Sequence, residues 1–486
     1  MQAKVKKTGI GLFWLLLWEL LARSIGNALV LPTPFQALTA LGTLMAEPTF
    51  FSRLVTSQLH VLGGFLLAAA LGSTLGWIAA ENTILSQFLA VPVQGMRAIP
   101  VACFVVFALF LLPSAHLALL VVFLLVFPLV YQNAWDGRRA VDGSLLTMAR
   151  SFHVPFSRRF RGVLLPGVVP FLSAAFQTAS GLAWKGGVAA EMIAFSANSV
   201  GDALFQSKIL LDMPALFAWT AVILLISYAN TALLLFLWKK GANRWMRIGV
   251  IRRQSYAPQG RTSGFADDPH SLLENEKTML FALQHVGVSF AGKAVLQDVS
   301  TALFAKERVQ ISGPSGRGKT TLLSVIAAEK EPDEGRLVYG ADPALRFSII
   351  FQENRLLEQH SVRENLRFVG LSETEMEEGL TALELLDAAD RKASTLSGGM
   401  KRRLALLRAL LSPGDLLLLD EPFAGLDEAM RRKTADYIFQ CSKRFCALLV
   451  CDPILDGEEE TRRRLGITAV WHIQDDGSLW SEARQV

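Results

Sequence analysis

Hydrophobic positions are spread unevenly along the chain. Before about residue 240 they form six long apolar runs, each near or above the roughly 20 residues that a helix needs to cross a bilayer. The pattern predicts membrane-spanning helices at 9–30, 58–80, 84–112, 115–133, 166–190 and 214–237. After residue 278, short apolar runs alternate with helical patterns, which is typical of a soluble α/β domain. The pattern therefore predicts two domains of different character.

The boundary between the two domains lies in a polar stretch. Residues 251–278 are rich in Pro, Gly, Ser and charges and show no apolar period, which is typical of a linker. We expect an α-helical transmembrane domain at 1–250, this linker, and an α/β domain at 279–486. The first apolar run has the basic start of a signal peptide, but no clear small-residue cleavage site follows it. This favours an uncleaved first span.

The low share of charged residues agrees with a membrane protein. The chain is 51% hydrophobic and 19% charged, against about 25% charged in an average soluble domain. A net charge of +5 alone would also suit nucleic-acid binding. However, the basic residues flank the predicted spans in three groups: Lys4, Lys6 and Lys7; Arg138, Arg139, Arg150, Arg158, Arg159 and Arg161; and Lys239, Lys240, Arg244 and Arg247.

These three basic groups fall on one side of a six-span topology, and the positive-inside rule makes that side cytosolic. We therefore expect a multi-pass protein of the cytoplasmic (inner) membrane. Both termini and the α/β domain are expected in the cytosol. Because membrane flanking accounts for the basic residues, no nucleic-acid partner is needed.

The chain has four cysteines: Cys103, Cys441, Cys446 and Cys451. None forms a CxxC pair, and the five-residue spacing of the last three suits neither a zinc site nor a disulfide framework. They are interpreted as small apolar packing residues in a reducing compartment.

A phosphate-binding motif lies between a short predicted strand, Arg308–Ser312, and a helix. It reads G-x-x-x-x-G-K-[ST], and glycines there let backbone N–H groups wrap a phosphate at a helix N-terminus. Lys319 is predicted to reach the β- and γ-phosphates of ATP, and Thr320 to ligate Mg²⁺. The predicted nucleotide-binding residues are Gly313, Pro314, Ser315, Gly316, Arg317, Gly318, Lys319, Thr320 and Thr321.

A pair of adjacent carboxylates follows roughly 100 residues later. The apolar strand Leu416–Leu419 ends in Asp420 and Glu421. Asp420 is predicted to hold Mg²⁺ through water, and Glu421 to polarise the attacking water. Two neighbouring carboxylates are weak evidence alone, but their distance from the phosphate loop makes the pattern specific for ATP hydrolysis.

Between these motifs lies the sequence Leu396-Ser-Gly-Gly-Met400. With it, residues 280–480 resemble the ATPases of ABC transporters. The resemblance implies that Ser397, Gly398, Gly399 and Met400 form a signature that faces the γ-phosphate of a nucleotide held by another subunit. A hydroxyl, backbone N–H groups and a helix N-terminus all favour an anion.

The same resemblance assigns three further residues. Gln352 would sense the metal and the nucleophile and touch the membrane domain. Asp427 would lie in the loop that crosses the dimer interface. Phe290 would stack on adenine, although a core position is the alternative for a lone aromatic residue.

The membrane half resembles the permeases of type I ABC importers. In the cytosolic stretch 145–176, the residues Ala149, Phe160, Leu165 and Pro166 fit the family's coupling loop. Thr147 stands in place of the motif's Glu, Met148 of its first Ala, and His153 of its Gly. The alternative is a basic loop lying at the lipid headgroups.

Residues 29–38, 92–112 and 181–194 look like permeases of the nitrate, sulfonate and taurine importers, a family that includes carriers of thiamine precursors. The resemblance implies import of a small solute by a permease fused to its ATPase. ATP is sandwiched between two such ATPases, so the chain should pair with a second copy or a related half-transporter. An external solute-binding protein would deliver the substrate.

Two basic residues fall inside or beside predicted spans. Arg97 and Lys185 are candidates for lining the translocation path, where they would favour an anion. Snorkelling, or for Lys185 pairing with Glu191, is the alternative.

Cys451 occupies the place where the ATPase family has a switch histidine before an aspartate, here Asp452. A thiol cannot reproduce the imidazole contact to phosphate, so hydrolysis is predicted to be slow, with ATP binding retained. A nucleotide-binding membrane scaffold or sensor is therefore the alternative function. An exporter is a second alternative, but exporters lack the coupling-loop pattern.

Overall fold

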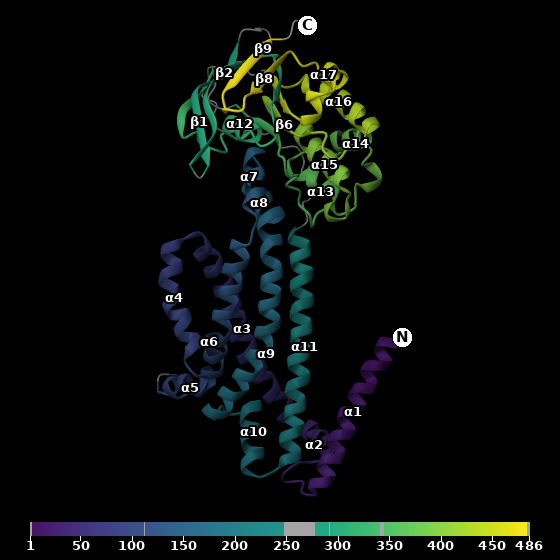
Figure 1. Cartoon of the computed structure of the whole chain (residues 1–486). Helices are drawn as coiled ribbons and strands as arrows, with labels where there is room; N and C mark the ends of the chain where they lie inside the picture. The colour runs from purple at the N-terminus through teal and green to yellow at the C-terminus, as the bar shows by residue number, and fades with distance from the viewer. Residues whose placement is uncertain (1, 111, 247–277, 291, 341–344, 484–486) are drawn as a thin grey trace. The chain divides into compact units, whose positions relative to one another are not determined.

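The computed structural model describes residues 2–110, 112–246, 278–290, 292–340 and 345–483 (Figure 1). The chain divides into two compact units, Met1–Val141 with Gly167–Trp245, and Asp142–Pro166 with Met246–Val486. Segment 142–166, expected in the permease domain, therefore groups with the α/β unit. The predicted linker lies outside the described residues apart from its last position.

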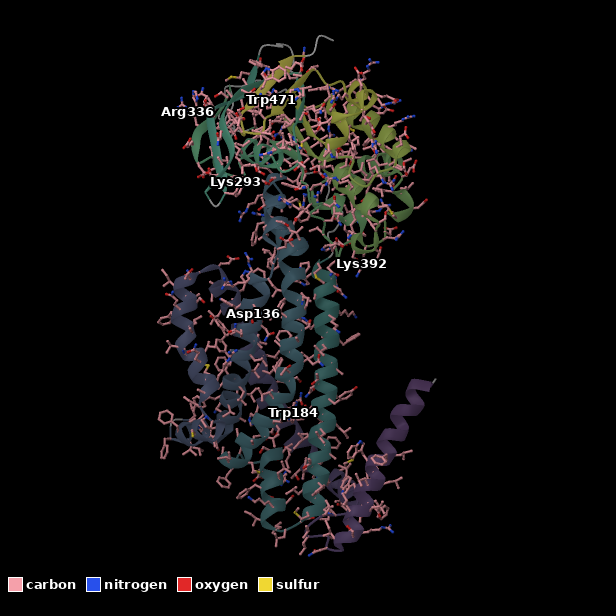
Figure 2. All side chains as sticks on the ribbon, in the orientation of Figure 1. Asp136, Trp184, Lys293, Arg336, Lys392 and Trp471 are labelled. Atoms are coloured by element: carbon pink, nitrogen blue, oxygen red, sulfur yellow. The ribbon has the colours of Figure 1, made fainter. Side chains whose placement is uncertain are left out.

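The regular elements described in the first unit are all helices. Figure 2 shows that carbon dominates its side chains, among them Trp184, which is 2% exposed, whereas nitrogen and oxygen atoms crowd the α/β unit. Its helices are α1 (Gln2–Ile25), α2 (Pro34–Ala46), α3 (Phe50–Glu81), α4 (Thr83–Ala98), α5 (Val101–Leu109), α6 (Ser114–Arg139), α9 (Leu165–Ala194), α10 (Val200–Ile209) and α11 (Met213–Met246).

Four helices of the described residues are long and apolar enough to cross a membrane: Phe50–Glu81, His116–Arg139, Phe156–Ala194 and Met213–Met246. They coincide with four of the six predicted spans. The predicted span 84–112 is instead a pair, α4 and α5, bent by 101°, and counting it gives five. The break falls at Ile99–Pro100, because a residue before proline avoids helical backbone angles.

The first predicted span, 9–30, corresponds to α1, which ends at Ile25. The side chains of residues 2–11 lie outside the described set, so this span stays a prediction.

Small residues let α3 and α6 pack closely. Gly64, Ala68, Gly72 and Gly76 recur every fourth position, which places them on one face of α3. A Cβ atom at Gly64 would lie 2.5 Å from the carbonyl oxygen of Leu119, and one at Gly76 2.3 Å from that of Tyr131. This is the small-residue packing that membrane helices use in place of a hydrophobic driving force.

An ion pair relates the ends of α3 and α6. Arg138 contacts Glu81 at 2.8 Å, so both helices end on the same side of the unit. The α4–α5 pair therefore carries the chain back to the start of α6 on the opposite side. The bent pair thus leads from one side of the unit to the other, as a single span would, although it is not a straight helix.

The second unit begins with the segment α7 (Gly143–Ser151), α8 (Phe156–Arg159) and the π-helical turn η1 (Phe160–Leu164). Its strands are β1 (Met279–Phe290), β2 (Lys293–Phe304), β3 (Arg308–Ser312), β4 (Glu334–Tyr339), β5 (Phe347–Ile350), β6 (Leu416–Asp420), β7 (Ala447–Cys451), β8 (Ala469–Ile473) and β9 (Leu479–Ala483). Its other α-helices are α12 (Lys319–Ile326), α13 (Val362–Phe368), α14 (Glu373–Ala382), α15 (Gly398–Leu411), α16 (Glu428–Ser442) and α17 (Glu459–Leu465).

The strands form two sheets. A six-stranded sheet has the order β5-β6-β7-β3-β8-β9, parallel except for β9, and a three-stranded antiparallel sheet has the order β2-β1-β4. Every residue of β6 and β7 is buried, as expected of central parallel strands covered on both faces. The predicted strands Arg308–Ser312, Leu416–Leu419 and Ala447–Val450 are β3, β6 and β7. Their carboxyl ends meet at one edge, where α/β sheets bind ligands.

Candidate functional site

The phosphate loop joins β3 to α12. Gly318 has a φ of +95° and precedes Lys319, the first residue of α12. Gly313 has a φ of +147°, and a Cβ atom there would lie 2.7 Å from the carbonyl oxygen of Ile473 in β8. Only glycine fits at both positions. The loop therefore places backbone N–H groups at a helix N-terminus, as a phosphate requires.

Lys319 is held over this loop. It is 8% exposed, and its ammonium donates to the carbonyl oxygens of Gly313 at 2.6 Å and Pro314 at 3.0 Å. Arg317 is turned outward and pairs with Asp475 at 3.1 Å. Of the two basic residues in the predicted loop, Lys319 is therefore buried and Arg317 is exposed.

The two predicted carboxylates lie beside the loop. Asp420 ends β6 and pairs in the ladder with Cys451 of β7, and Cys451 is also the ladder partner of Ile311 in β3. Glu421 follows in a left-handed backbone conformation, with a φ of +50°. Its amide donates to the carbonyl oxygen of Cys451. The structure therefore brings Lys319, Thr320, Asp420, Glu421 and Cys451 together at one sheet edge.

Burial is the main cause that raises the pKa of Asp420 above its usual value. The neighbouring Glu421 carboxylate raises it further, whereas the Thr320 hydroxyl, the Arg402 guanidinium and the Cys451 thiol lower it. Asp420 Oδ1 is buried with no hydrogen-bond partner among the described residues. An unpartnered carboxylate oxygen beside a threonine hydroxyl is a donor set that suits Mg²⁺.

Cys451 does not have the surroundings of a reactive thiol. It is 1% exposed, and burial raises its pKa, with the Asp420 carboxylate adding to the effect. A neutral thiol is neither a nucleophile nor a good metal ligand. Within the described residues, no group of three or more His, Cys, Asp and Glu side chains could hold a metal ion.

The signature residues start α15. Ser397 caps the helix and accepts a hydrogen bond from the Met400 amide at 3.3 Å. A Cβ atom at Gly399 would lie 2.8 Å from the carbonyl oxygen of Gly425, close to the predicted interface residue Asp427, which caps α16. In the described part of the chain, none of these residues hydrogen-bonds to the phosphate loop. The described structure thus shows no hydrogen bond between the signature residues and the phosphate loop of the same chain.

Two further predicted residues lie on the surface. Phe290 ends β1 with 51% of its surface exposed, and the ammonium of Lys330 lies 4.6 Å from the centre of its ring. This excludes the core position considered for Phe290. Gln352 follows β5 and is exposed, while its carbonyl oxygen accepts from Arg402 at 3.3 Å.

The predicted coupling loop contains a helix ending that normally uses glycine. The amide of Val154 donates to the carbonyl oxygen of Ala149, and that of His153 to the carbonyl oxygen of Arg150, as in a Schellman motif. His153 has a φ of +50°. The left-handed turn gives a physical reason for the glycine of the family motif. Phe160 lies in η1, and Leu165 and Pro166 begin α9.

This loop contacts the rest of the α/β unit. Ser151 donates to Glu329 Oε1 at 3.3 Å, and Arg158 donates to the carbonyl oxygen of Phe368 at 3.3 Å. The guanidinium of Arg408 lies 5.4 Å from the ring centre of Phe152. The segment is therefore packed against ATPase residues, which argues against a loop that only lies at lipid headgroups.

Replacing His153 by glycine is expected to stabilise the chain by about 0.5–1 kcal/mol, because glycine adopts the left-handed conformation without a Cβ penalty. The denaturant midpoint of the purified chain measures the effect. Thr147→Gly, inside α7, is the matched control and should instead destabilise the chain, by about 0.3 kcal/mol. A lower midpoint for His153→Gly would contradict the prediction.

The two candidate path residues both have exposed side chains. Arg97 is exposed and donates to the carbonyl oxygen of Pro128 at 3.3 Å. Lys185 is exposed and has no hydrogen bond or ion pair among the described residues. Its suggested partner Glu191 is instead buried and contacts Ser57 and His60.

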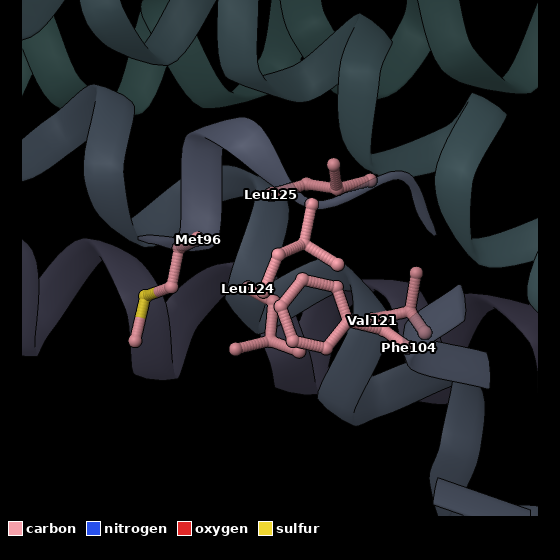
Figure 3. A pocket seen from close by; sticks show the side chains of 6 residues that line it. Met96, Phe104, Val121, Leu124 and Leu125 are labelled. Atoms are coloured by element: carbon pink, nitrogen blue, oxygen red, sulfur yellow. The ribbon is translucent and has the colours of Figure 1, made fainter. Parts of the chain in front are cut away.

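A small pocket between α4, α5 and α6 is apolar and offers no site for an anion (Figure 3). It is lined by Met96, Ile99, Phe104, Val121, Leu124 and Leu125.

Sequence reasoning missed Arg402, which is 2% exposed and hydrogen-bonded to the backbone of both Asp420 and Glu421. In the sequence, Arg402 stands between Lys401 and Arg403. No sequence feature distinguishes the buried residue of this run from its two more exposed neighbours. It also missed Glu329, whose contact to Ser151 spans 178 positions of sequence.

Three features define an ATP-binding cassette: the phosphate loop after β3, the carboxylates at the end of β6, and the Ser-Gly-Gly start of α15. In the parallel sheet, β7 lies between β3 and β6. The cassette stands in one chain with an apolar helical domain. Comparison with known families agrees. Residues 296–424 match the family described as ABC transporter, and residues 72–248 match the binding-protein-dependent transport system inner membrane component.

Individual relatives are similar to the ATPase half. The chain is 33% identical over 179 residues to the taurine import ATP-binding protein TauB of Pseudomonas syringae pv. tomato, covering 34% of this chain and 69% of the relative. It is 36% identical over 165 residues to the aliphatic sulfonates import ATP-binding protein SsuB 1 of Pseudomonas savastanoi pv. phaseolicola, covering 33% and 68%. The chain belongs to the ABC transporter family, as a multi-pass membrane protein with a helical permease domain fused to an α/β ATPase domain.

Other matches are less complete. The chain spans 44% of the spermidine/putrescine import ATP-binding protein PotA of Protochlamydia amoebophila, which is 39% identical over 165 residues and matches 31% of this chain. It spans 49% of the Fe(3+) ions import ATP-binding protein FbpC of Streptomyces avermitilis. Among solved structures, the dimeric structure of a bacterial ABC transporter cassette matches 43% of this chain and 100% of its own, with 22% identity and a TM-score of 0.37.

Proposed function

We propose that this chain is half of an ATP-driven importer of a small solute in the cytoplasmic membrane, with its ATPase domain in the cytosol. ATP binding would close two ATPase domains, the coupling loops would move, and the membrane path would change the side to which it opens. Hydrolysis would reset the cycle. The observation that supports this best is the cluster of Lys319, Thr320, Asp420 and Glu421 at one sheet edge, in a chain that also carries a permease domain.

The individual residues have separate roles in this proposal. Lys319 binds the β- and γ-phosphates, and Thr320 and Asp420 hold Mg²⁺, which neutralises phosphate charge when bound. Glu421 accepts the proton of the attacking water. Gln352 relates this site to the membrane domain, and Phe290 offers an exposed ring to adenine.

The proposed active form is a dimer of this chain. The signature residues Ser397 to Met400 make no hydrogen bond with the phosphate loop of the described structure, which supports their use by a second subunit. Asp427, exposed beside them, would cross the interface. A related half-transporter with a normal switch position is the other candidate partner.

The proposed substrate is a small solute. It is either an anion, such as a sulfonate or nitrate, or a molecule that resembles a thiamine precursor. Taurine and aliphatic sulfonates are named for two of the relatives. A separate solute-binding protein would deliver it, since the permease half matches a binding-protein-dependent family.

Transport in proteoliposomes tests the proposal. Vesicles containing the purified chain, the solute-binding protein and internal Mg-ATP should accumulate labelled solute against its gradient. Thermal-shift screening of the binding protein with sulfonates, nitrate, thiamine precursors and aromatic acids selects the solute. ATP-driven movement in the opposite direction would establish an exporter. ATP binding without any transport would establish the scaffold or sensor.

Lys185→Ala is expected to lower transport of an anionic solute roughly 10-fold, because a charge-assisted hydrogen bond is worth about 1.5–3 kcal/mol. The basal ATPase rate should stay unchanged, since Lys185 lies outside the ATPase unit. Uptake is compared with that of Lys208→Ala, an exposed lysine of α10. Unchanged transport of every candidate anion would exclude Lys185 from the path.

Cys451→His is expected to raise the ATPase rate about 10-fold or more. An imidazole N–H donates strongly to phosphate whereas a thiol donates weakly, and such a bond is worth about 1.5–3 kcal/mol. Cys451→Ser, which lacks the ring, is the matched control and should show no comparable gain. An equal or lower rate for Cys451→His would show that position 451 is not the switch position.

A further inference from the structure

Arg402 is a buried cation on α15, two residues beyond the signature, and is only 2% exposed. Its guanidinium reaches two separate segments of backbone. In the first, Nε donates to the carbonyl oxygen of Glu421 at 3.0 Å, and Nη2 donates to that of Asp420. Both acceptors lie in the turn that ends β6 and carries the proposed catalytic carboxylate.

The second segment is the loop that follows β5. Nη1 of Arg402 donates to the carbonyl oxygen of Phe351 at 2.7 Å and to that of Gln352 at 3.3 Å. It also donates to Asn354 Oδ1 at 3.1 Å. The planar guanidinium, with five donors in a rigid fork, can serve both segments at once. A single side chain therefore joins the loop of Gln352 to the turn of Glu421.

The hydrogen bonds of Arg402 go mainly to backbone rather than to carboxylates. Burial lowers its pKa below the usual value, and the nearby carboxylates of Asp420, Glu421 and Asp452 oppose that effect. No ion pair links Arg402 to these groups within the described ranges. A buried charge needs hydrogen bonds to offset its desolvation, and here backbone carbonyls of the two catalytic segments supply most of them.

The turn at Glu421 needs such support. Its left-handed backbone is unfavourable for a residue with a side chain. The Glu421 amide is tied to β7 through the Cys451 carbonyl, and the Glu421 carbonyl is tied to α15 through Arg402. The carboxylate itself makes no hydrogen bond in the described structure, so backbone contacts hold its position.

The loop of Gln352 is also anchored from its other end. Arg408 lies on α15 beyond Arg402, by nearly two turns, and is 1% exposed. It donates to the carbonyl oxygens of Asn354 at 3.0 Å and Arg355 at 2.8 Å. Its guanidinium lies over Phe152 of the coupling loop. The loop of Gln352 is thus fixed between an arginine that reaches the catalytic turn and one that reaches the coupling loop.

We propose that Arg402 is a positioning residue for ATP hydrolysis, which ties the Gln352 loop to the Glu421 turn so that both move as one unit. The inference rests on the proposed function, because it assigns Glu421 the role of general base. Arg402 acts through the backbone of these segments and does not itself touch the nucleotide.

Steady-state hydrolysis by the full-length purified chain tests this role. Arg402→Gln is expected to lower kcat about 10-fold while KM for ATP changes less than 2-fold, since the phosphate loop is untouched. Arg402→Lys should stay within 2-fold of Arg402→Gln, because one ammonium cannot span both segments. The control is Arg403→Gln on the same helix, whose guanidinium donates to the carbonyl oxygen of Leu383, and it should retain kcat.

Three kinetic outcomes would overturn the proposal. The first is an Arg402→Gln enzyme with kcat within 2-fold of wild type. The second is full rescue by Arg402→Lys, which would show that charge and not the two-segment tie matters. The third is a variant that also loses ATP binding, which would make the residue structural.

Hydrogen exchange separates this inference from the proposed function, because it needs no turnover. In Arg402→Gln, amides of residues 347–356 and 420–424 should both exchange at least 3-fold faster than in wild type and in Arg403→Gln. Faster exchange in one segment only, or in neither, would overturn the tie even if the wild-type chain proved not to hydrolyse ATP. A wild-type chain with slow exchange but no hydrolysis would refute the proposed function alone.

Discussion

Glu421→Gln is expected to lower the rate of ATP hydrolysis at least ~100-fold while ATP still binds. A general base contributes about 10²–10⁴-fold, and an amide of the same shape cannot take a proton. Glu421 is half-buried and its carboxylate has no hydrogen-bond partner among the described residues, so the substitution should leave the fold intact. Phosphate release and equilibrium binding of a fluorescent ATP analogue measure the two effects.

Glu353→Gln is the matched control for this variant. Glu353 is an exposed carboxylate one residue beyond Gln352, with no hydrogen bond or ion pair within the described ranges. It should keep the wild-type rate. If Glu421→Gln hydrolyses ATP as fast as the control, Glu421 is not the base. If wild type and both variants bind ATP but none hydrolyses it, the result favours the scaffold or sensor function over the ATP-driven importer.

Lys319→Ala is expected to weaken ATP binding by about 10- to 100-fold or more. Each charge-assisted hydrogen bond to phosphate is worth about 1.5–3 kcal/mol, and the lysine reaches two phosphates. The folded chain should lose two hydrogen bonds to its own loop, those to Gly313 and Pro314, so a small loss of stability is also expected.

Thermal unfolding measures the binding effect of Lys319→Ala. A ligand at 100 times its Kd stabilises the folded state by about 2.7 kcal/mol. At a concentration of Mg-ATP that gives this effect in wild type, the Tm of the variant should therefore rise clearly less. Lys392→Ala, an exposed lysine of the same domain (Figure 2), serves as the control and should respond like wild type. An ATP-dependent Tm shift in Lys319→Ala equal to that of the control would contradict this assignment.

Local sequence patterns were sufficient to predict a feature when all the residues that define it lie in one segment. The phosphate loop needs a strand, glycines with positive φ and a helix start within about a dozen residues, and the structure has β3, Gly313, Gly318 and α12 in that order. Continuous apolar runs likewise predicted β6 and four spanning helices. A central strand covered on both faces and a helix that crosses the apolar part of a bilayer both leave no polar face in the sequence. The resemblance predicted the ABC transporter family, which the family comparisons confirm. The nitrate, sulfonate and taurine importer family and the substrate stay predictions, because no single motif encodes the substrate.

Patterns failed where a residue's role depends on distant partners. Arg402 is indistinguishable in the sequence from Lys401, whose ammonium pairs with Glu358 near the surface. Hydropathy alone also treated 84–112 as one span, although the Ile99–Pro100 pair marks the bend. The grouping of segment 142–166 with the α/β unit could not be seen either, since its contacts to Glu329 and Phe368 lie about 200 positions away.

The sequence by itself indicated a helical half and an α/β half, four of the six predicted spans and the motifs of the proposed ATP site, because hydrophobic period and glycine placement act through neighbouring residues. The tertiary structure decided which charged groups are buried together. Only the alignment of β3, β6 and β7 brings Lys319 of one segment to Asp420 of another and leaves Cys451 beside both. Likewise, only the packing of α15 brings the buried guanidinium of Arg402 to both the Gln352 loop and the Glu421 turn. Burial changes the energy of a charge far more than its sequence neighbours do.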